Sequence, residues 1–485
     1  MGLKIINNAI YSIQNVFTSF KYSVLGFEVE YPITIQWHIT DECQNNCKHC
    51  YMSDLRTMDR GNKNILTLQQ KIDIIKQFDK FGNKYGFLFG HYLLIGGDPL
   101  LADDVFDLVK ELKKRGKSIS FAGNPETLTD ENCKKLKKNG ITNFQLSLDG
   151  LEKTHDAIRG IGSFKKTIDG YSQLEKHGIN ATTMFTLSSL NINEFFDLID
   201  YVFYNTKSKG FAFDFCVHIG NAKNIQTNIT PETALEISNR YLDLKILRER
   251  ERPDFHFGEK PGFLRLLHLQ RKEILFNERG VTNFIAGCLI GNRCECILSD
   301  GSIPICRRLP EILGKLPEDS YEEIYLANET LKKYRRPQFF VDCGKCIGWN
   351  WCRGCPSLSN EEVGDPFVKP NICYIHLLGI KTYQEHEPIS MNTTLKEEAD
   401  LIKKNTRHRY RNLYLGCKFP IKVLTAIKKL KNPIEANSFA ENTKEWFSRK
   451  APKLNNDEQD IVLFHYNLKA LGFIRNYYKG PKWPT

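Results

Sequence analysis

The chain has 485 residues, of which 41% are hydrophobic and 12% aromatic, so it holds ample apolar material for a folded core and is not a disordered chain. Its formal net charge is +11, and residues 396–485 hold 19 Lys and Arg against 9 Asp and Glu, so nearly all of the excess lies in the last fifth. The absence of a secretory signal and of any run of 18 apolar residues predicts a cytoplasmic protein without a membrane-spanning helix.

Helical and strand patterns alternate between residues 34 and 247. Strands are predicted over 34–40, 92–95, 118–121, 144–148, 181–187 and 211–219. Helices are predicted over 66–81, 103–114, 130–138, 163–176, 193–204 and 231–247, the first with Thr67 as its N-cap and Gly82 as its end. Strands separated by helices of this length form right-handed βαβ units and a parallel sheet. The pattern therefore predicts an α/β fold with a partial (β/α)6 barrel.

Outside the barrel pattern the composition changes several times. A helical segment is expected at 1–30, the barrel at 31–250, a charged bridge at 251–287, a small Cys-rich domain at 288–384 and a mainly helical basic extension at 385–485. In the Cys-rich region turns replace helical periodicity, as expected where metal sites hold the fold. The basic extension suits an acidic partner or forms a solvated helical face.

The 15 cysteines do not suggest a disulfide framework, because thiols of a cytoplasmic protein stay reduced. Twelve of them fall in two zones, 43–50 and 288–373, and such clustering predicts metal binding. The other three, Cys133, Cys216 and Cys417, are expected to be small buried apolar side chains.

The first zone, Cys43, Cys47 and Cys50, follows the first predicted strand, at the edge where α/β sheets bind their ligands. Three thiolates at this spacing can hold a [4Fe–4S] cluster, which normally takes four, and leave one iron open for a small molecule. A zinc knuckle is the alternative, but structural zinc prefers four closed ligands.

With Tyr51 next in the chain, this Cys-x3-Cys-x2-Cys stretch resembles the cluster motif of the radical S-adenosylmethionine (SAM) enzymes, over roughly residues 30–375. The resemblance implies that SAM binds the open iron. It further implies that reduction splits SAM into methionine and a 5′-deoxyadenosyl radical, which abstracts hydrogen from a substrate. The expected catalytic residues are the three cysteines.

Further stretches resemble the family's SAM-contact regions. Gly96-Gly97-Asp98-Pro99 is similar to the family's GGEP stretch, with Asp98 in place of the usual Glu. Residues 147–160 resemble the fourth-strand region, which implies SAM contacts for Ser147 and Arg159 and a place for Asp149 beside them. The resemblance thus implies a SAM-binding set of Tyr51, Gly96, Gly97, Asp98, Asn124, Ser147, Asp149 and Arg159.

The second cysteine zone resembles a SPASM domain, which carries two auxiliary [4Fe–4S] clusters. The resemblance implies Cys288, Cys294, Cys306 and Cys355 as ligands of the first, and Cys343, Cys346, Cys352 and Cys373 as ligands of the second. Two residues instead of the usual three separate Cys352 from Cys355, and either Cys294 or Cys296 fits as a ligand. A pair of zinc ribbons is the alternative.

The resemblance implies an enzyme that modifies a ribosomally made peptide or protein, for example by a thioether cross-link or an oxidation. A flavodoxin or ferredoxin is the implied electron donor. Sulfatase maturation is not expected, because Arg307 replaces the Asp base of those enzymes and a guanidinium accepts no proton. Arg307 and Arg308 suit an acidic peptide or a carboxylate, or are surface charge.

Three other functions compete with this interpretation. The first is a SPASM-like small-molecule enzyme of cofactor or haem biosynthesis. The second is an RNA-modifying enzyme, because aromatic residues interleave the basic ones of the extension, although nucleic acid is not the favoured partner. The third, a simple iron–sulfur electron carrier, does not require an open iron.

Overall fold

The computed structural model describes residues 29–30, 33–53, 65–226, 229–271, 287–292, 294–379, 383 and 385–408. The chain forms two compact units, one of Tyr31–Thr406 and one that combines Met1–Glu30 with Arg407–Thr485. The described part of the second unit is a short antiparallel pair, β1 (Val29–Glu30) with β12 (Arg407–His408). The predicted N-terminal helical segment, Cys417 and most of the basic extension lie outside the described residues.

The first unit is built on an eight-stranded sheet in the order β8-β7-β6-β5-β4-β3-β2-β9, in which every neighbouring pair is parallel. The strands are β2 (Ile33–His38), β3 (Phe89–Ile95), β4 (Ser118–Ala122), β5 (Asn143–Ser147), β6 (Asn180–Leu187), β7 (Gly210–Phe215), β8 (His256–Phe257) and β9 (Cys294–Ile297). Strands β2 to β7 follow one another in chain order. The predicted partial (β/α)6 barrel is therefore confirmed, and β8 and β9 add one strand at each edge.

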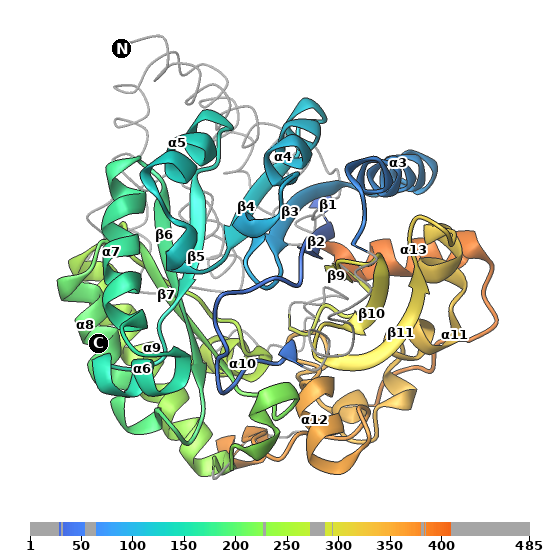
Figure 1. Cartoon of the computed structure of the whole chain (residues 1–485). Helices are drawn as coiled ribbons and strands as arrows, with labels where there is room; N and C mark the ends of the chain where they lie inside the picture. Colours follow the sequence, from blue (N-terminus) through green and yellow to red (C-terminus); the bar gives the residue numbers. More distant parts are fainter. Residues whose placement is uncertain are drawn as a thin grey trace, which may run out of the picture. The chain divides into compact units, whose positions relative to one another are not determined.

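Helices alternate with these strands and cover the outer side of the sheet (Figure 1). They are α3 (Leu68–Tyr85), α4 (Val105–Lys114), α5 (Asp130–Lys138), α6 (Glu152–Arg159), α7 (Ser163–Lys176), α8 (Phe195–Asn205), α9 (Pro231–Glu251) and α10 (Gly262–Arg271). Strand β8 and helix α10 both fall in the predicted bridge. No helix in the described ranges combines the length and the apolar character needed to cross a membrane.

The ends of helix α3 show how local sequence sets its length. The Thr67 side chain accepts a hydrogen bond from the Gln70 backbone N–H, and Gln70 reciprocates, so the predicted N-cap is confirmed as a capping box. The predicted end at Gly82 is wrong. The helix continues to Tyr85 and ends at Gly86, whose φ of 76° is a left-handed cap. Gly82 lies inside the helix where a side chain would strike the Phe87 carbonyl, at 2.5 Å.

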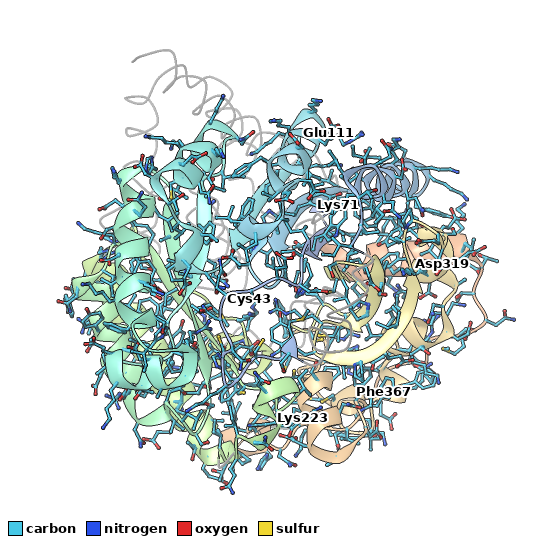
Figure 2. All side chains as sticks on the ribbon, viewed as in Figure 1. Cys43, Lys71, Glu111, Lys223, Asp319 and Phe367 are labelled. Atoms are coloured by element: carbon cyan, nitrogen blue, oxygen red, sulfur yellow. The ribbon has the colours of Figure 1, made fainter. Side chains whose placement is uncertain are left out.

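The core lies between the sheet and its helices. In β2 the side chains of Ile33, Ile35 and Trp37 are buried, with Thr34 and Gln36 between them less so. This period of two directs one face to the helices and the other to the inner side of the barrel. In Figure 2, Cys43 lies on that inner side, whereas Glu111 on α4 lies on the helical side.

The Cys-rich region contains an antiparallel hairpin of β10 (Ser302–Cys306) and β11 (Leu309–Lys315), followed by the short helices α11 (Glu329–Lys333) and α12 (Pro356–Val363) and many turns. Helix α13 (Leu395–Thr406) comes after it. The fully buried carboxylate of Glu398 on α13 binds two arginines, with 3.0 Å to Arg335 and 2.6 Å to Arg336. This ion cluster fixes α13 to the first unit.

Candidate functional site

The predicted site residues come together at one edge of the sheet. The cysteine loop follows β2, Gly96 and Gly97 follow β3, Asn124 follows β4, and Asp149 follows β5. Because the strands are parallel, their carboxyl ends share this edge, where α/β proteins place their active sites.

The cysteine loop is held by backbone contacts with the loop after β3. Gly97 N–H donates to the Thr40 carbonyl at 2.9 Å, and Asp98 N–H donates to the Glu42 carbonyl at 2.6 Å. A Cβ atom on Gly96 would lie 2.3 Å from the Thr40 oxygen, and one on Gly97 would lie 2.0 Å from the Glu42 oxygen. Both glycines therefore fit the chain's own cysteine loop, a constraint that the SAM-binding prediction did not include.

A second brace comes from the loop after β7. Asn221 Nδ2 donates to the Cys47 carbonyl at 3.0 Å, and Asn221 N–H donates to the Cys50 carbonyl at 3.1 Å. Gly220 has a φ of 60°, and a side chain there would strike the Cys50 carbonyl at 2.4 Å. This brace was not predicted, because nothing in the sequence links Asn221 to cysteines more than 170 positions away.

The three thiols of the first motif lie close together and face hydrogen-bond donors. Asn124 Nδ2 lies 3.2 Å from Cys43 Sγ, and Arg159 Nη1 lies 3.8 Å from Cys47 Sγ. Burial raises the pKa of the Cys47 thiol, the Arg159 charge opposes this, and the Cys50 and Cys43 thiols add to the rise. The donor set, three thiols with N–H groups directed at two of them, fits an iron–sulfur cluster with cysteine ligands.

Asp149 is the centre of the polar network beneath this motif. Its carboxylate is fully buried, pairs with the Arg159 Nε–H, lies 3.3 Å from His49 Nε2 and accepts the Thr186 N–H at 2.7 Å. Burial alone would raise the pKa of Asp149, but the Arg159 and His49 charges hold that pKa well below its usual range. Arg159 is thus bound to a carboxylate of the chain itself.

The other predicted SAM contacts have different surroundings. Asp98 is buried, where its carboxylate accepts hydrogen bonds from Thr127 Oγ1 at 2.8 Å and from the Leu100 N–H at 3.2 Å, and burial raises its pKa to about 6. Ser147 ends β5 opposite Met184 of β6. Tyr51 lies against two basic side chains, since its ring centre is 5.4 Å from the Arg307 guanidinium and 6.4 Å from the His38 ring.

The described auxiliary thiols fall into two groups. Burial raises the pKa of Cys288, to which the neighbouring Cys306 contributes, and it raises the pKa of Cys355 to about 12, to which Cys288 contributes. Burial likewise raises the pKa of Cys352, to which Cys373, Cys343 and Cys346 all contribute. Electrostatic interactions therefore link Cys288 with Cys306 and Cys355, and they link Cys352 with Cys343, Cys346 and Cys373.

The short segment Cys352-Arg353-Gly354-Cys355 connects the two groups. Arg353 and Gly354 have φ values of 64° and 67°, so the chain makes a tight left-handed turn between the two cysteines. A Cβ on Gly354 would lie 2.9 Å from Cys343 Sγ. Because of this turn, Cys352 belongs to the group with Cys343, and Cys355 belongs to the group with Cys288.

Cys294 and Cys296 lie on β9, beside β2. The Cys294 side chain lies outside the described residues, and Cys296 packs with Met52 and Leu298 next to Cys50 and Tyr51. The predicted small buried thiols Cys133 and Cys216 are 0% and 5% exposed, which confirms that they are buried. No cysteine with a described side chain forms a disulfide, and no three described His, Cys, Asp or Glu side chains converge as around a single metal ion.

A parallel α/β fold with three thiols on the loop after its first strand is the arrangement expected of an enzyme that binds a cluster and a small molecule at the sheet edge. Residues 37–202 match the family model of the Radical SAM superfamily. These residues therefore form a radical SAM domain, the domain of an enzyme superfamily. A [4Fe–4S] cluster and SAM are the cofactors that this family implies.

The chain is also similar to two kinds of proteins, a heme synthase and a maturation protein. The AdoMet-dependent heme synthase of Methanosarcina barkeri is 26% identical, over 70% of this chain and 96% of the relative. The sporulation killing factor maturation protein SkfB of Bacillus subtilis is 24% identical, over 60% of this chain and 64% of the relative. Among solved structures, Streptococcus suis SuiB bound to its precursor peptide SuiA has a TM-score of 0.56 at 14% identity, covering 77% of this chain and 82% of SuiB. That likeness shows the fold.

Proposed function

We propose that this radical SAM enzyme carries three [4Fe–4S] clusters and modifies a ribosomally made peptide or protein. The observation that carries the cluster proposal is the grouping of the thiols, three at the sheet edge and seven in two groups of the Cys-rich region. We propose that the Cys-rich region spans 288–384 and that it follows a barrel at 31–250 and a bridge at 251–287.

The proposed ligands follow the two groups. Cys288, Cys306 and Cys355 form the first auxiliary set with Cys294, and Cys343, Cys346, Cys352 and Cys373 form the second. Cys296 on the same strand is the alternative fourth ligand of the first set. Cys43, Cys47 and Cys50 would hold the SAM-binding cluster, which would supply the electron for reductive cleavage of SAM.

The chain's own residues prepare this site in two ways. Asn124 and Arg159 direct N–H groups at Cys43 and Cys47, which stabilises the thiolates that a cluster needs. The loop after β3, through Gly97, and the loop after β7, through Asn221, hold the backbone of the cysteine loop from two sides. Tyr51, Gly96, Gly97, Asp98, Ser147 and Asp149 remain proposed SAM-site residues, several of them acting through the loop that they hold.

The peptide substrate is supported by the likeness to SkfB, a maturation protein, and by the fold shared with SuiB. A flavodoxin or ferredoxin is the proposed electron donor. A second candidate is favoured by a specific observation, because the heme synthase relative is matched over 96% of its length. A porphyrin-type small molecule is therefore the alternative substrate.

Anaerobic assays of the reconstituted enzyme test this proposal. The enzyme is incubated with SAM, dithionite and either small peptides encoded beside its gene or iron coproporphyrin III, and 5′-deoxyadenosine and substrate mass are measured. We expect a peptide to raise 5′-deoxyadenosine formation and to change in mass. Conversion of the porphyrin alone would contradict the peptide proposal and support the alternative, and failure to form 5′-deoxyadenosine under any condition would contradict both.

A further inference from the structure

The turn of the β10–β11 hairpin contacts both the loop after β2 and strand β7. Cys306 pairs with Leu309, so Arg307 and Arg308 are the two turn residues. Arg307 lies over the ring of Tyr51, on the loop after β2, and Arg308 Nη2 lies 3.2 Å from Asp214 Oδ2 on β7. Because β2 and β7 each lie one strand from an edge of the sheet, the turn spans the open side of the barrel.

The two arginines differ in their partners. Arg308 is paired with Asp214, and the two side chains are 18% and 16% exposed, so neither is simply surface charge. Arg307 forms no ion pair with any carboxylate in the described part of the chain. A partly buried guanidinium without a carboxylate is unfavourable, and its planar N–H donors suit bidentate binding of one.

His38 supplies a second group without a partner at the same place. It ends β2, is 0% exposed, and neither ring nitrogen has a hydrogen-bond partner within the described ranges. Its ring meets the Tyr51 ring edge-on, and burial together with the Arg307 charge lowers the pKa of His38. A buried imidazole N–H without an acceptor is costly, and such groups are normally satisfied by a ligand or by water.

We propose that Arg307, with His38 and Tyr51, binds a carboxylate of the substrate next to the first cysteine motif. This proposal rests on the proposed function in one respect, because it takes the bound carboxylate to belong to the substrate of the enzyme. The substrate is then an acidic molecule, whether a peptide with Asp or Glu side chains or a small molecule with propionate groups. Both sources present the same chemistry to the guanidinium.

Equilibrium binding to the reconstituted holoenzyme, measured by anaerobic isothermal titration, tests this. The first probe pair is iron coproporphyrin III and its tetramethyl ester. The second is a C-terminally amidated Gly–Ser decapeptide with two glutamates and the same amidated peptide with glutamines. We expect at least one acid to bind more than about tenfold tighter than its neutral partner, since a charge-assisted bidentate pair is lost in the latter. Preference for the porphyrin acid or for the peptide acid identifies the source.

Variants assign the preference to the guanidinium. In Arg307→Gln we expect the ratio of the dissociation constants of the neutral and acidic probes to fall below about twofold. In Arg307→Lys we expect part of this preference to remain. The matched control is Arg240→Gln, because Arg240 on α9 also lies over an aromatic ring, Phe196 at 3.8 Å, and forms no ion pair in the described chain. This control should bind both probe pairs as the wild type does.

Equal binding of acid and neutral probes, or a preference that survives in Arg307→Gln, would overturn the proposal. Weaker SAM binding in Arg307→Gln with an unchanged probe preference would assign the guanidinium to the SAM carboxylate and would also overturn it. An enzyme that binds acids through Arg307 but never forms 5′-deoxyadenosine would contradict the proposed function alone.

Discussion

Asp149 shows how one buried carboxylate organises the site at the scale of single residues. It binds Arg159, which in turn faces Cys47, and it also lies beside His49 within the cysteine motif. The sequence placed Asp149 and Arg159 in the same region of the site, but it could not show that they bind each other. That pairing depends on how helix α6 turns back over the end of β5, and α6 itself was not predicted, because only eight residues carry its pattern.

Asp149→Asn should destabilise the protein strongly. The change keeps the shape but removes the charge that balances a guanidinium 14% exposed, and breaking a buried ion pair costs about 3–5 kcal/mol. Urea denaturation of the apoprotein measures the free energy of unfolding. Asp130→Asn is the control, because Asp130 is 40% exposed and its solvent-screened surface pairs contribute little to stability. Equal losses in the two variants would contradict the account.

Glu295 on β9 gives a prediction for pH dependence. It is buried beside Tyr321 and Arg335, and burial raises the pKa of its carboxyl to about 8. Between about pH 4.5 and 8 the folded state therefore holds a proton that the unfolded state has lost, so the contribution of Glu295 to the free energy of unfolding falls as pH rises. Glu295→Gln should flatten this slope in urea titrations between pH 5.5 and 8. Parallel slopes for wild type and variant would refute the assignment.

At the scale of elements, the six βα units were predictable because each has a long periodic pattern. Strand β9 was not, since four residues with two cysteines and a glutamate carry no strand pattern. Its conformation comes from pairing with the edge of β2, which is tertiary. The extension of helix α3 past Gly82 has a local origin instead, because the better cap is Gly86 and the apolar stripe of Phe78 and Phe81 continues toward it.

Helix α13 docks in part through one buried acidic residue. Glu398 is 0% exposed, binds Arg335 and Arg336, and also accepts a hydrogen bond from Thr393 at 2.8 Å. Glu398→Gln would leave two buried guanidinium groups without a carboxylate. We therefore expect the free energy of unfolding to fall by about 3–5 kcal/mol, and we expect proteolysis within 385–408 to begin at a lower urea concentration than in the wild type.

Asp400→Asn on the same helix is the control for that experiment. Asp400 is 54% exposed in its pair with Lys403, so its change should cost about 1 kcal/mol or less. If Glu398→Gln were no more sensitive to protease than Asp400→Asn, the proposed role of the buried ion cluster would be wrong.

At the scale of the whole molecule, the structure joins three groups of thiols through two connections. The segment Cys352–Cys355 links the two auxiliary groups, and the Arg307-Arg308 turn after Cys306 links one of them to Tyr51 beside the first motif. The resemblance to the SPASM pattern implied these groups, whereas cysteine spacing alone would have placed Cys352 and Cys355 together. The position of the arginines was not predictable, since it depends on the hairpin crossing the open side of the barrel.

The most direct test of the account is the iron and sulfide content of the anaerobically reconstituted full chain, with zinc measured alongside. We predict about twelve irons for wild type and about eight for both Cys43/Cys47/Cys50→Ala and Cys343/Cys346→Ala, with 5′-deoxyadenosine lost only in the first variant. About four irons in wild type, with zinc in the Cys-rich region and no change in iron for Cys343/Cys346→Ala, would contradict the proposal of two auxiliary clusters.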